Sequence, residues 1–187
     1  MITDKAQLKE YLGRDMAFFH ALSGRDRLVC VLTGDPAWRI VKYLRFLRRE
    51  ELHLNRCRGP VDRVLAHWFR LRKNRLGERL GFKIPPNTLG PGVAIYHHGG
   101  LIVNEAARIG ADAVFHGNNC IGNNGKTDEN PVIGDGLDLG FGAAVIGPVT
   151  LGNRVRVGAN AVVTASFPED DITLAGLPAK NVRQEHP

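Results

Sequence analysis

The sequence has few cysteines, few aromatic residues and no long apolar run. Its three cysteines, Cys30, Cys57 and Cys120, are odd in number and lack Cys-x-x-Cys spacing. Structural disulfides and a zinc knuckle are therefore not expected, and a reducing cytoplasmic compartment fits. No apolar stretch approaches the roughly 20 residues that span a bilayer, and none follows the polar start at residues 1–5, so we expect neither a membrane span nor a signal peptide.

Acidic residues are scarce in one part of the chain. The formal net charge is +6, but residues 38–83 hold 14 Lys/Arg against 4 Asp/Glu. Such a basic segment is typical of a solvated helix face, and it also fits contact with an acidic polymer or an anionic membrane surface. It contains no recognisable nucleic-acid-binding motif, so we expect no nucleic-acid partner.

Helix signals fill the first 83 residues. Thr3 or Asp4 can cap a first helix, Asp35-Pro36 starts a second, and Gly59-Pro60 separates the latter from a third. Two apolar stripes at helical spacing follow these starts, and we expect them to pack on each other and against another subunit. The stripes are Trp38, Val41, Leu44 and Leu47, and Val61, Val64, Leu65, Trp68 and Leu71.

The rest of the chain shows a repeat of six residues. An apolar residue returns at almost every sixth position, usually followed by a small one. Neither a helix, with period 3.6, nor a simple strand, with period 2, produces this spacing, whereas a triangular coil with one inward residue per side does. The repeat is carried by Ile109, Phe115, Ile121, Ile133, Leu139, Val145, Leu151, Val157 and Val163. The pattern predicts a mainly β protein, a prism-shaped spiral of short strands.

These signals divide the chain into a helical segment at 1–83, a spiral at 84–166 and a tail at 167–187, which should leave the spiral. Pro85 and Pro86 mark the hinge because proline cannot continue a helix. The repeat slips by two residues beside His97 and His98, which indicates a distorted, functional coil. The stretch 122–130 lacks its apolar residue and predicts an extruded loop. The last residues, 184–187, should fray.

The repeat, with the motifs GPGVAIYHHGGLIVNEAARIG and GLPAKNV, resembles the hexapeptide-repeat acyltransferases. Within them it is similar to the serine acetyltransferases, especially shorter relatives associated with capsule and exopolysaccharide synthesis. The resemblance covers roughly residues 84–182. It implies a left-handed parallel β-helix, acetyl-CoA as donor, and a homotrimer with active sites between subunits. Longer members join trimers into hexamers through their helices, and the shorter segment here leaves that pairing open.

The resemblance assigns the catalytic histidine to His97. Imidazole, with a reference pKa near 6.5, can act as both base and acid at neutral pH. In this hypothesis His97 takes the acceptor's proton, the alkoxide attacks the thioester, and the imidazolium protonates the departing CoA sulfur. His98 and His116 are candidates for acceptor contact, with a purely structural role as the alternative for each.

Serine acetyltransferases orient their histidine with a carboxylate fifteen residues earlier, where this chain has Phe82. Glu105 or Asp112 can substitute from a neighbouring coil, or a backbone carbonyl can hold the ring. Family positions that contact the donor correspond to Gly122, Phe141 and Ala159. Lys180 matches a basic position near the CoA phosphates.

The acceptor positions differ from those of serine acetyltransferases. Those enzymes hold the serine carboxylate with an Arg-His pair before the loop's closing proline, where this chain has Glu129 and Asn130. They place an acidic residue before the catalytic histidine, where this chain has Tyr96. Neutral polar groups and an aromatic face suit a sugar hydroxyl better than a zwitterion. We therefore expect sugar O-acetylation in surface-polysaccharide synthesis, with L-serine as the alternative acceptor.

A different class stays open. Left-handed β-helices also carry metal hydratases that resemble γ-class carbonic anhydrases, which bind a metal through three histidines. His97, His98 and His116 are numerous enough, but adjacent histidines diverge in an extended chain and the spaced metal motif is absent. We expect no metal. Docking of a C-terminal isoleucine into a partner enzyme, as some serine acetyltransferases do, is not expected from an end in His186-Pro187.

Overall fold

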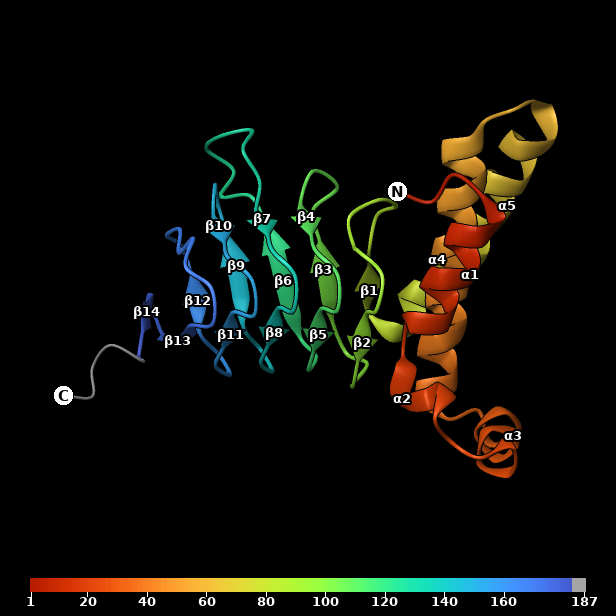
Figure 1. Ribbon diagram of the computed structural model, residues 1–187, viewed down its shortest axis with the longest axis horizontal. Coiled ribbons are helices and arrows are strands. Elements are labelled where there is room, and N and C mark those ends of the chain that lie inside the picture. Colours follow the sequence, from red (N-terminus) through yellow and green to blue (C-terminus); the bar gives the residue numbers. More distant parts are fainter. Residues whose placement is uncertain (183–187) are drawn as a thin grey trace.

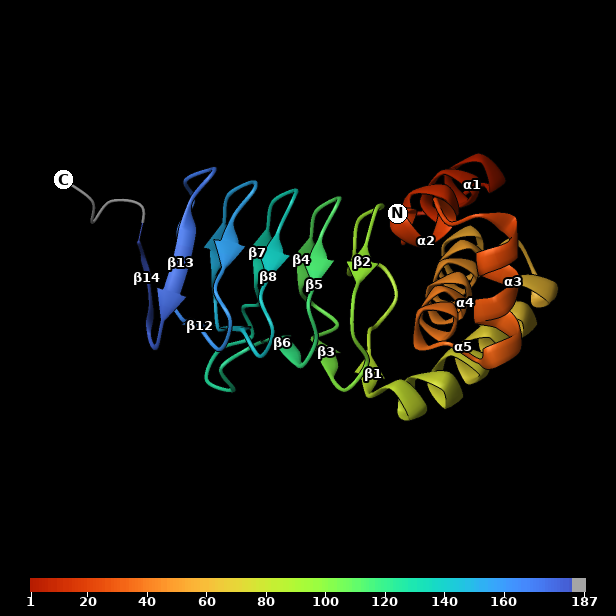
Figure 2. The ribbon, with the colours of Figure 1, turned by 90° about the horizontal axis from the view of Figure 1, so that it is seen from below.

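A computed structural model describes residues 1–182. The helices gather at one end of a long spiral of short strands (Figures 1 and 2). The helices are α1 (Lys5–Arg14), α2 (Ala17–His20), α3 (Gly24–Thr33), α4 (Pro36–Arg56) and α5 (Pro60–Leu80). Within the described residues, no helix is both long and apolar enough to cross a membrane.

The helix starts follow the capping signals. The Asp4 carboxylate accepts from the backbone N–H of Gln7, and the Asp35 carboxylate accepts from that of Ala37. Proline stands at the start of α4 and of α5, where a missing N–H costs nothing. The three predicted starts are confirmed, whereas the short helices α2 and α3 were not predicted.

The strands form three sheets that enclose the apolar core. The first sheet has the order β1-β3-β6-β9-β12, the second β10-β7-β4 and the third β14-β13-β11-β8-β5-β2. Every pair is parallel except β13 with β14. The strands are β1 (Phe82–Lys83), β2 (Ala94–Ile95), β3 (Leu101–Val103), β4 (Arg108–Ile109), β5 (Val114–Phe115), β6 (Asn119–Gly122), β7 (Val132–Ile133), β8 (Asp138–Leu139), β9 (Ala144–Ile146), β10 (Thr150–Leu151), β11 (Arg156–Val157), β12 (Val162–Val163), β13 (Thr173–Gly176) and β14 (Ala179–Asn181).

The six-residue repeat supplies the core of the spiral. Phe115, Ile121 and Ile133 occupy consecutive sides of the prism, and each is at least 95% buried. Small residues follow because successive coils stack closely at the corners. A Cβ at Gly90, for example, would lie 2.5 Å from the carbonyl of Gly110 in the next coil. The predicted β-helix is confirmed.

Two boundaries differ from the expectation. The first strand is Phe82–Lys83, which precedes the expected hinge. Gly81 ends α5 with φ +76°, and the next residue, Phe82, already pairs with Leu101 of the spiral. The tail does not leave the spiral at Phe167. Leu174 is fully buried and pairs in parallel with Val157, so the spiral continues into β13. The expected fraying at 184–187 lies outside the described residues.

The two apolar stripes of the helical segment differ in how far they are buried. Val41, Leu44 and Leu47 of α4 are buried, as expected. Most of the α5 stripe stays exposed in this chain, from 68% at Val61 to 44% at Leu71. Trp68 is the member that meets α4, since its ring lies edge-on to Phe46 at 6.4 Å. The opposite face of α5, which includes the small residues Ala66 and Gly77, is buried instead, and small side chains allow close approach of two helices.

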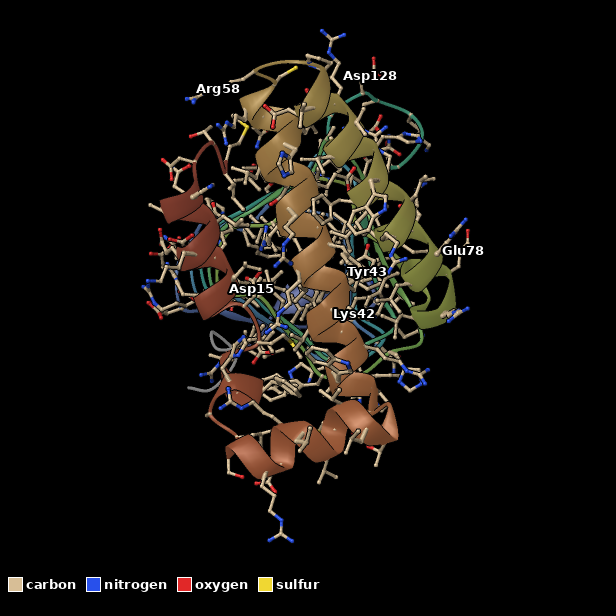
Figure 3. All side chains as sticks on the ribbon, turned by 90° about the vertical axis from the view of Figure 1, so that its right-hand side faces the viewer. Asp15, Lys42, Tyr43, Arg58, Glu78 and Asp128 are labelled. Carbon is tan, nitrogen blue, oxygen red and sulfur yellow. The ribbon has the colours of Figure 1, made fainter. Side chains whose placement is uncertain are left out.

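A buried arginine joins the helices to the spiral. Arg48 of α4 is fully buried, and its Nε donates to Asp15 at 2.8 Å while its Nη1 pairs with Glu51 at 3.1 Å. The same guanidinium donates to the carbonyls of Leu89 and Gly90, at the first coil. Burial raises the pKa of Glu51, and Arg48 opposes that rise. Figure 3 looks onto this helical end and shows Asp15 between α1 and α4.

Candidate functional site

Turns from successive coils stack along one edge of the prism, where the chain passes from the third sheet to the first. We call this the His97 edge, and it comprises residues 96–100, 116–118, 140–142 and 158–160. It brings together six of the residues predicted from the sequence. These are Tyr96, His97, His98, His116, Phe141 and Ala159, each of which lies between a strand of the third sheet and a strand of the first.

The turn that carries His97 is two residues longer than the corresponding turn of the next coil, which carries His116. Ile95 pairs with Phe115, and Val103 pairs with Ile121. The step from Ile95 to Val103 is eight residues, whereas the step from Phe115 to Ile121 in the next coil is six. The extra length is accommodated by glycines at φ +112° and +136°, Gly99 and Gly100. The predicted distortion beside the histidines is confirmed.

The end of α5 anchors this turn. The carbonyl of Leu80 accepts from the N–H of Gly99 at 2.9 Å, and the carbonyl of Gly81 accepts from that of Leu101 at 3.0 Å. His97 and His98 are exposed. Within residues 1–182, neither imidazole has a recorded hydrogen bond. The backbone is therefore held while the imidazole of His97 faces solvent.

Gly117 lies directly against His97. A Cβ placed at Gly117 would be 3.2 Å from the Cβ of His97 and 3.4 Å from the ring of Phe141. The turn is fixed from inside by Asn119, which accepts from the N–H of Gly117 and donates to the carbonyl of Gly140. Three successive coils thus place a histidine, a glycine and an exposed phenylalanine in contact.

A row of rings borders the His97 edge. Phe18, from α2, lies 5.4 Å from the ring of Tyr96, and Tyr96 lies 5.2 Å from the ring of His116. The Nε2 atom of His116 is 2.9 Å from the Asp138 carboxylate. Aromatic faces and a histidine–carboxylate pair therefore adjoin His97, and the helical segment contributes to this surface.

The remaining predicted residues lie elsewhere in the single chain. Gly122, Glu129 and Asn130 belong to the edge between the first and second sheets, where the loop from β6 to β7 projects as expected (Figure 1). Lys180 lies in β14, in the last part of the spiral that the structure describes. The chain by itself does not bring Gly122, Glu129 and Asn130 to the His97 edge. Lys180 lies near the end of that edge, because it pairs with Ala175, which lies against Gly158.

Within residues 1–182, neither Glu105 nor Asp112 lies at the His97 edge. Asp112 pairs with Arg14 at 2.8 Å and lies between the second and third sheets. Glu105 lies between the first and second sheets, at another corner. Phe82, at the family's carboxylate position, is buried and packs edge-on against Tyr43. Among residues 1–182, no three His, Cys, Asp or Glu side chains are grouped to hold a metal ion.

Sequence reasoning missed three contributors to this surface, Phe18, Gly117 and Asp138. The signal for Asp138 was available, because it precedes a buried repeat residue and so points outward one coil from His116. Gly117 also follows from the repeat. Phe18 carries no such signal, since only the packing of α2 against the spiral brings its ring to Tyr96.

The architecture defines a class of protein, the hexapeptide-repeat β-helix preceded by helices. Within that class, this chain is serine acetyltransferase-like in both sequence and fold. The serine acetyltransferase of Mycobacterium tuberculosis is 33% identical over 135 residues, which are 66% of this chain and 58% of the relative. That of Helicobacter pylori is 33% identical over 108 residues, 56% of this chain and 63% of the relative. The chain thus matches less than two thirds of either relative's length.

Solved structures agree on the fold. The soybean serine acetyltransferase apoenzyme superimposes with a TM-score of 0.74 at 25% identity, and the match covers 95% of this chain and 70% of that one. A serine acetyltransferase in complex with CoA gives a TM-score of 0.70 at 23% identity, over 95% of this chain and 71% of that one. No family model matches the chain. These relatives do not single out the capsule- and exopolysaccharide-associated subgroup.

Proposed function

We propose that this chain is an acetyl-CoA-dependent O-acetyltransferase in which His97 is the general base. The observation that carries the proposal is the His97 turn itself. A solvent-facing imidazole stands on a turn that is hydrogen-bonded to the end of α5, and Gly117 of the next coil lies beside it. The serine acetyltransferase relatives support the same reaction class.

The reaction needs one proton carrier. The imidazole of His97 takes the proton of the acceptor hydroxyl as its oxygen attacks the thioester carbon. The tetrahedral intermediate then collapses, the carbon–sulfur bond breaks, and the imidazolium returns the proton to the CoA sulfur. Atoms and charge balance without a covalent acetyl-enzyme.

Donor binding and assembly belong to the proposal as well. We assign Gly122, Phe141 and Ala159 to the path of the pantetheine arm and Lys180 to the CoA phosphates. Because Gly122 lies on a different edge from Phe141, a single chain cannot present them on one surface. A homotrimer, in which the edge of one subunit meets the face of another, would bring them together, and trimers can pair through the helices.

For the acceptor we propose a neutral sugar hydroxyl of a surface polysaccharide. Tyr96 offers an exposed ring beside the base, and the loop presents Glu129 and Asn130 in place of a cationic pair. A substrate carboxylate 4 Å from Glu129 would be repelled by about 1 kcal/mol in water and roughly 4 kcal/mol at an effective dielectric of 20. Three free cysteines support a reducing, cytoplasmic location.

L-Serine is the second candidate acceptor, and the relatives favour it. The relatives from Mycobacterium tuberculosis and Helicobacter pylori are named serine acetyltransferases, and the solved neighbours include complexes with serine. The choice between the two acceptors depends on whether the site accepts a carboxylate and an ammonium group.

The deciding experiment measures thiol release from acetyl-CoA with a panel of acceptors. The panel contains L-serine, L-serine methyl ester, monosaccharides, nucleotide sugars and capsular oligosaccharides. We expect turnover with a sugar and little with L-serine. Efficient turnover of L-serine alone would establish the second candidate, and no turnover with any acceptor would reject the acetyltransferase.

A further inference from the structure

We infer that Asp138 is a positioning residue that fixes the His116 ring as a hydrogen-bond acceptor for a hydroxyl of the acceptor substrate. This inference rests on the proposed function. It concerns how the His97 edge selects its acceptor, and it assigns a role to a carboxylate that the transfer step itself does not use.

The hydrogen-bond geometry sets the tautomer of His116. Its Nε2 atom lies 2.9 Å from Oδ1 of Asp138. An ionised carboxylate can only accept, so Nε2 must carry the hydrogen, and the Nδ1 atom of the neutral ring keeps a lone pair. Among residues 1–182, no recorded hydrogen bond involves Nδ1, and the His116 side chain is 40% exposed. A bound ligand can therefore donate to Nδ1.

The spiral holds both members of the pair in register. Val114 pairs with Asp138 and Phe115 with Leu139, so the carboxylate projects outward one coil away from the histidine. The N–H of His116 donates to the carbonyl of Leu139 at 3.1 Å, which fixes its backbone. The ring of Tyr96, 5.2 Å away in the preceding coil, borders the imidazole. Position and tautomer of the ring are thus both constrained.

A lone pair at this place favours a substrate group that can donate a hydrogen bond. A hydroxyl can donate to Nδ1, whereas a carboxylate has no hydrogen to donate and would face another acceptor. His116 directly precedes Gly117, which lies against His97. A hydroxyl-rich substrate that donates to Nδ1 would accordingly lie beside the proposed base, while the Asp138 charge disfavours an anionic group.

The test compares Asp138→Ala, Asp138→Asn and a control, Glu10→Ala, in the full chain. Glu10 is an exposed carboxylate paired with Arg14 on α1, away from the edge. With the best sugar of the acceptor panel, we expect Asp138→Ala to raise the acceptor KM about 10-fold with kcat changed less than about twofold. Asp138→Asn should stay near wild type, because its amide oxygen still accepts from Nε2–H, and Glu10→Ala should not change KM.

A spectroscopic readout separates tautomer control from simple structural support. In ¹⁵N-histidine-labelled protein, at a pH where histidines are neutral, His116 should carry its hydrogen on Nε2. That preference should weaken in Asp138→Ala and persist in Asp138→Asn. Assignment uses the resonances that disappear in His116→Gln.

The outcomes distinguish the two proposals. A hydrogen on Nδ1 in the wild type, or an unchanged acceptor KM in Asp138→Ala, overturns the role of Asp138 while acetyl transfer stands. With L-serine as the only acceptor, the same comparison is made on its KM, because its hydroxyl can also donate to Nδ1, and an unchanged KM overturns the role. Absence of transfer to every acceptor rejects the proposed function, and the acceptor role of His116 falls with it.

Discussion

Replacement of His97 by alanine should abolish most of the acetyl transfer and leave the fold intact. The imidazole is exposed and has no recorded hydrogen bond within residues 1–182. Its packing against Gly117 is made by Cβ, which alanine retains. A surface substitution of this kind changes the free energy of unfolding by no more than about 0.5 kcal/mol.

The expected loss of rate is much larger than any structural effect. General base catalysis contributes typically about 10²- to 10⁴-fold. At about 1.36 kcal/mol per factor of ten, that corresponds to roughly 2.7 to 5.4 kcal/mol of transition-state stabilisation. Loss of at least about 100-fold in kcat with an unchanged melting temperature would therefore locate the defect in the chemical step.

The assay is thiol release from acetyl-CoA with the best acceptor, accompanied by thermal unfolding and size-exclusion chromatography. His98→Ala is the matched control, because it removes the neighbouring exposed imidazole from the same turn. We expect it to retain activity within about tenfold of the wild type. If His97→Ala stays within that range, His97 is not the base. If His98→Ala alone is inactive, the roles of the two histidines must be exchanged.

Three further predictions concern stability. Arg48→Ala leaves two buried carboxylates without their cation and should lower the free energy of unfolding in urea by about 3–5 kcal/mol; a loss below about 1 kcal/mol would contradict the burial. In Gly90→Ala the new Cβ would lie 2.5 Å from backbone atoms, so the free energy of unfolding should fall by about 1–3 kcal/mol. In Gly13→Ala in α1 the new Cβ has no atom within 4 Å, so the same measurement should show a gain of up to about 1 kcal/mol. Hydrogen bonding to His53 lowers the pKa of Asp62; its contribution is complete above the unfolded value near 3.9 and is lost as pH falls through the folded value. Melting temperatures of wild type and Asp62→Asn should therefore converge in acid, and a constant difference between pH 3 and 6 would refute this.

The spiral was predictable because its signal is local and repeated. The spacing within a single six-residue side already shows that a residue such as Phe115 or Leu139 points into the core. The projecting loop and the irregular turn at His97 were predictable as departures from that repeat. The burial of the α5 stripe was not predictable, because periodicity identifies an apolar face, but not whether this chain covers it. Its contact with another subunit stays a prediction.

By itself the sequence determined the period, the direction of the side chains and the place of one irregular turn, because these follow from spacing along the backbone. Only the tertiary structure decided which turns share an edge. It placed Phe18 of α2 beside Tyr96 and Asp138 beside His116, while it kept Glu129 on another edge. Such neighbours depend on coil stacking and on the docking of helices, which are long-range contacts that no window of the sequence contains.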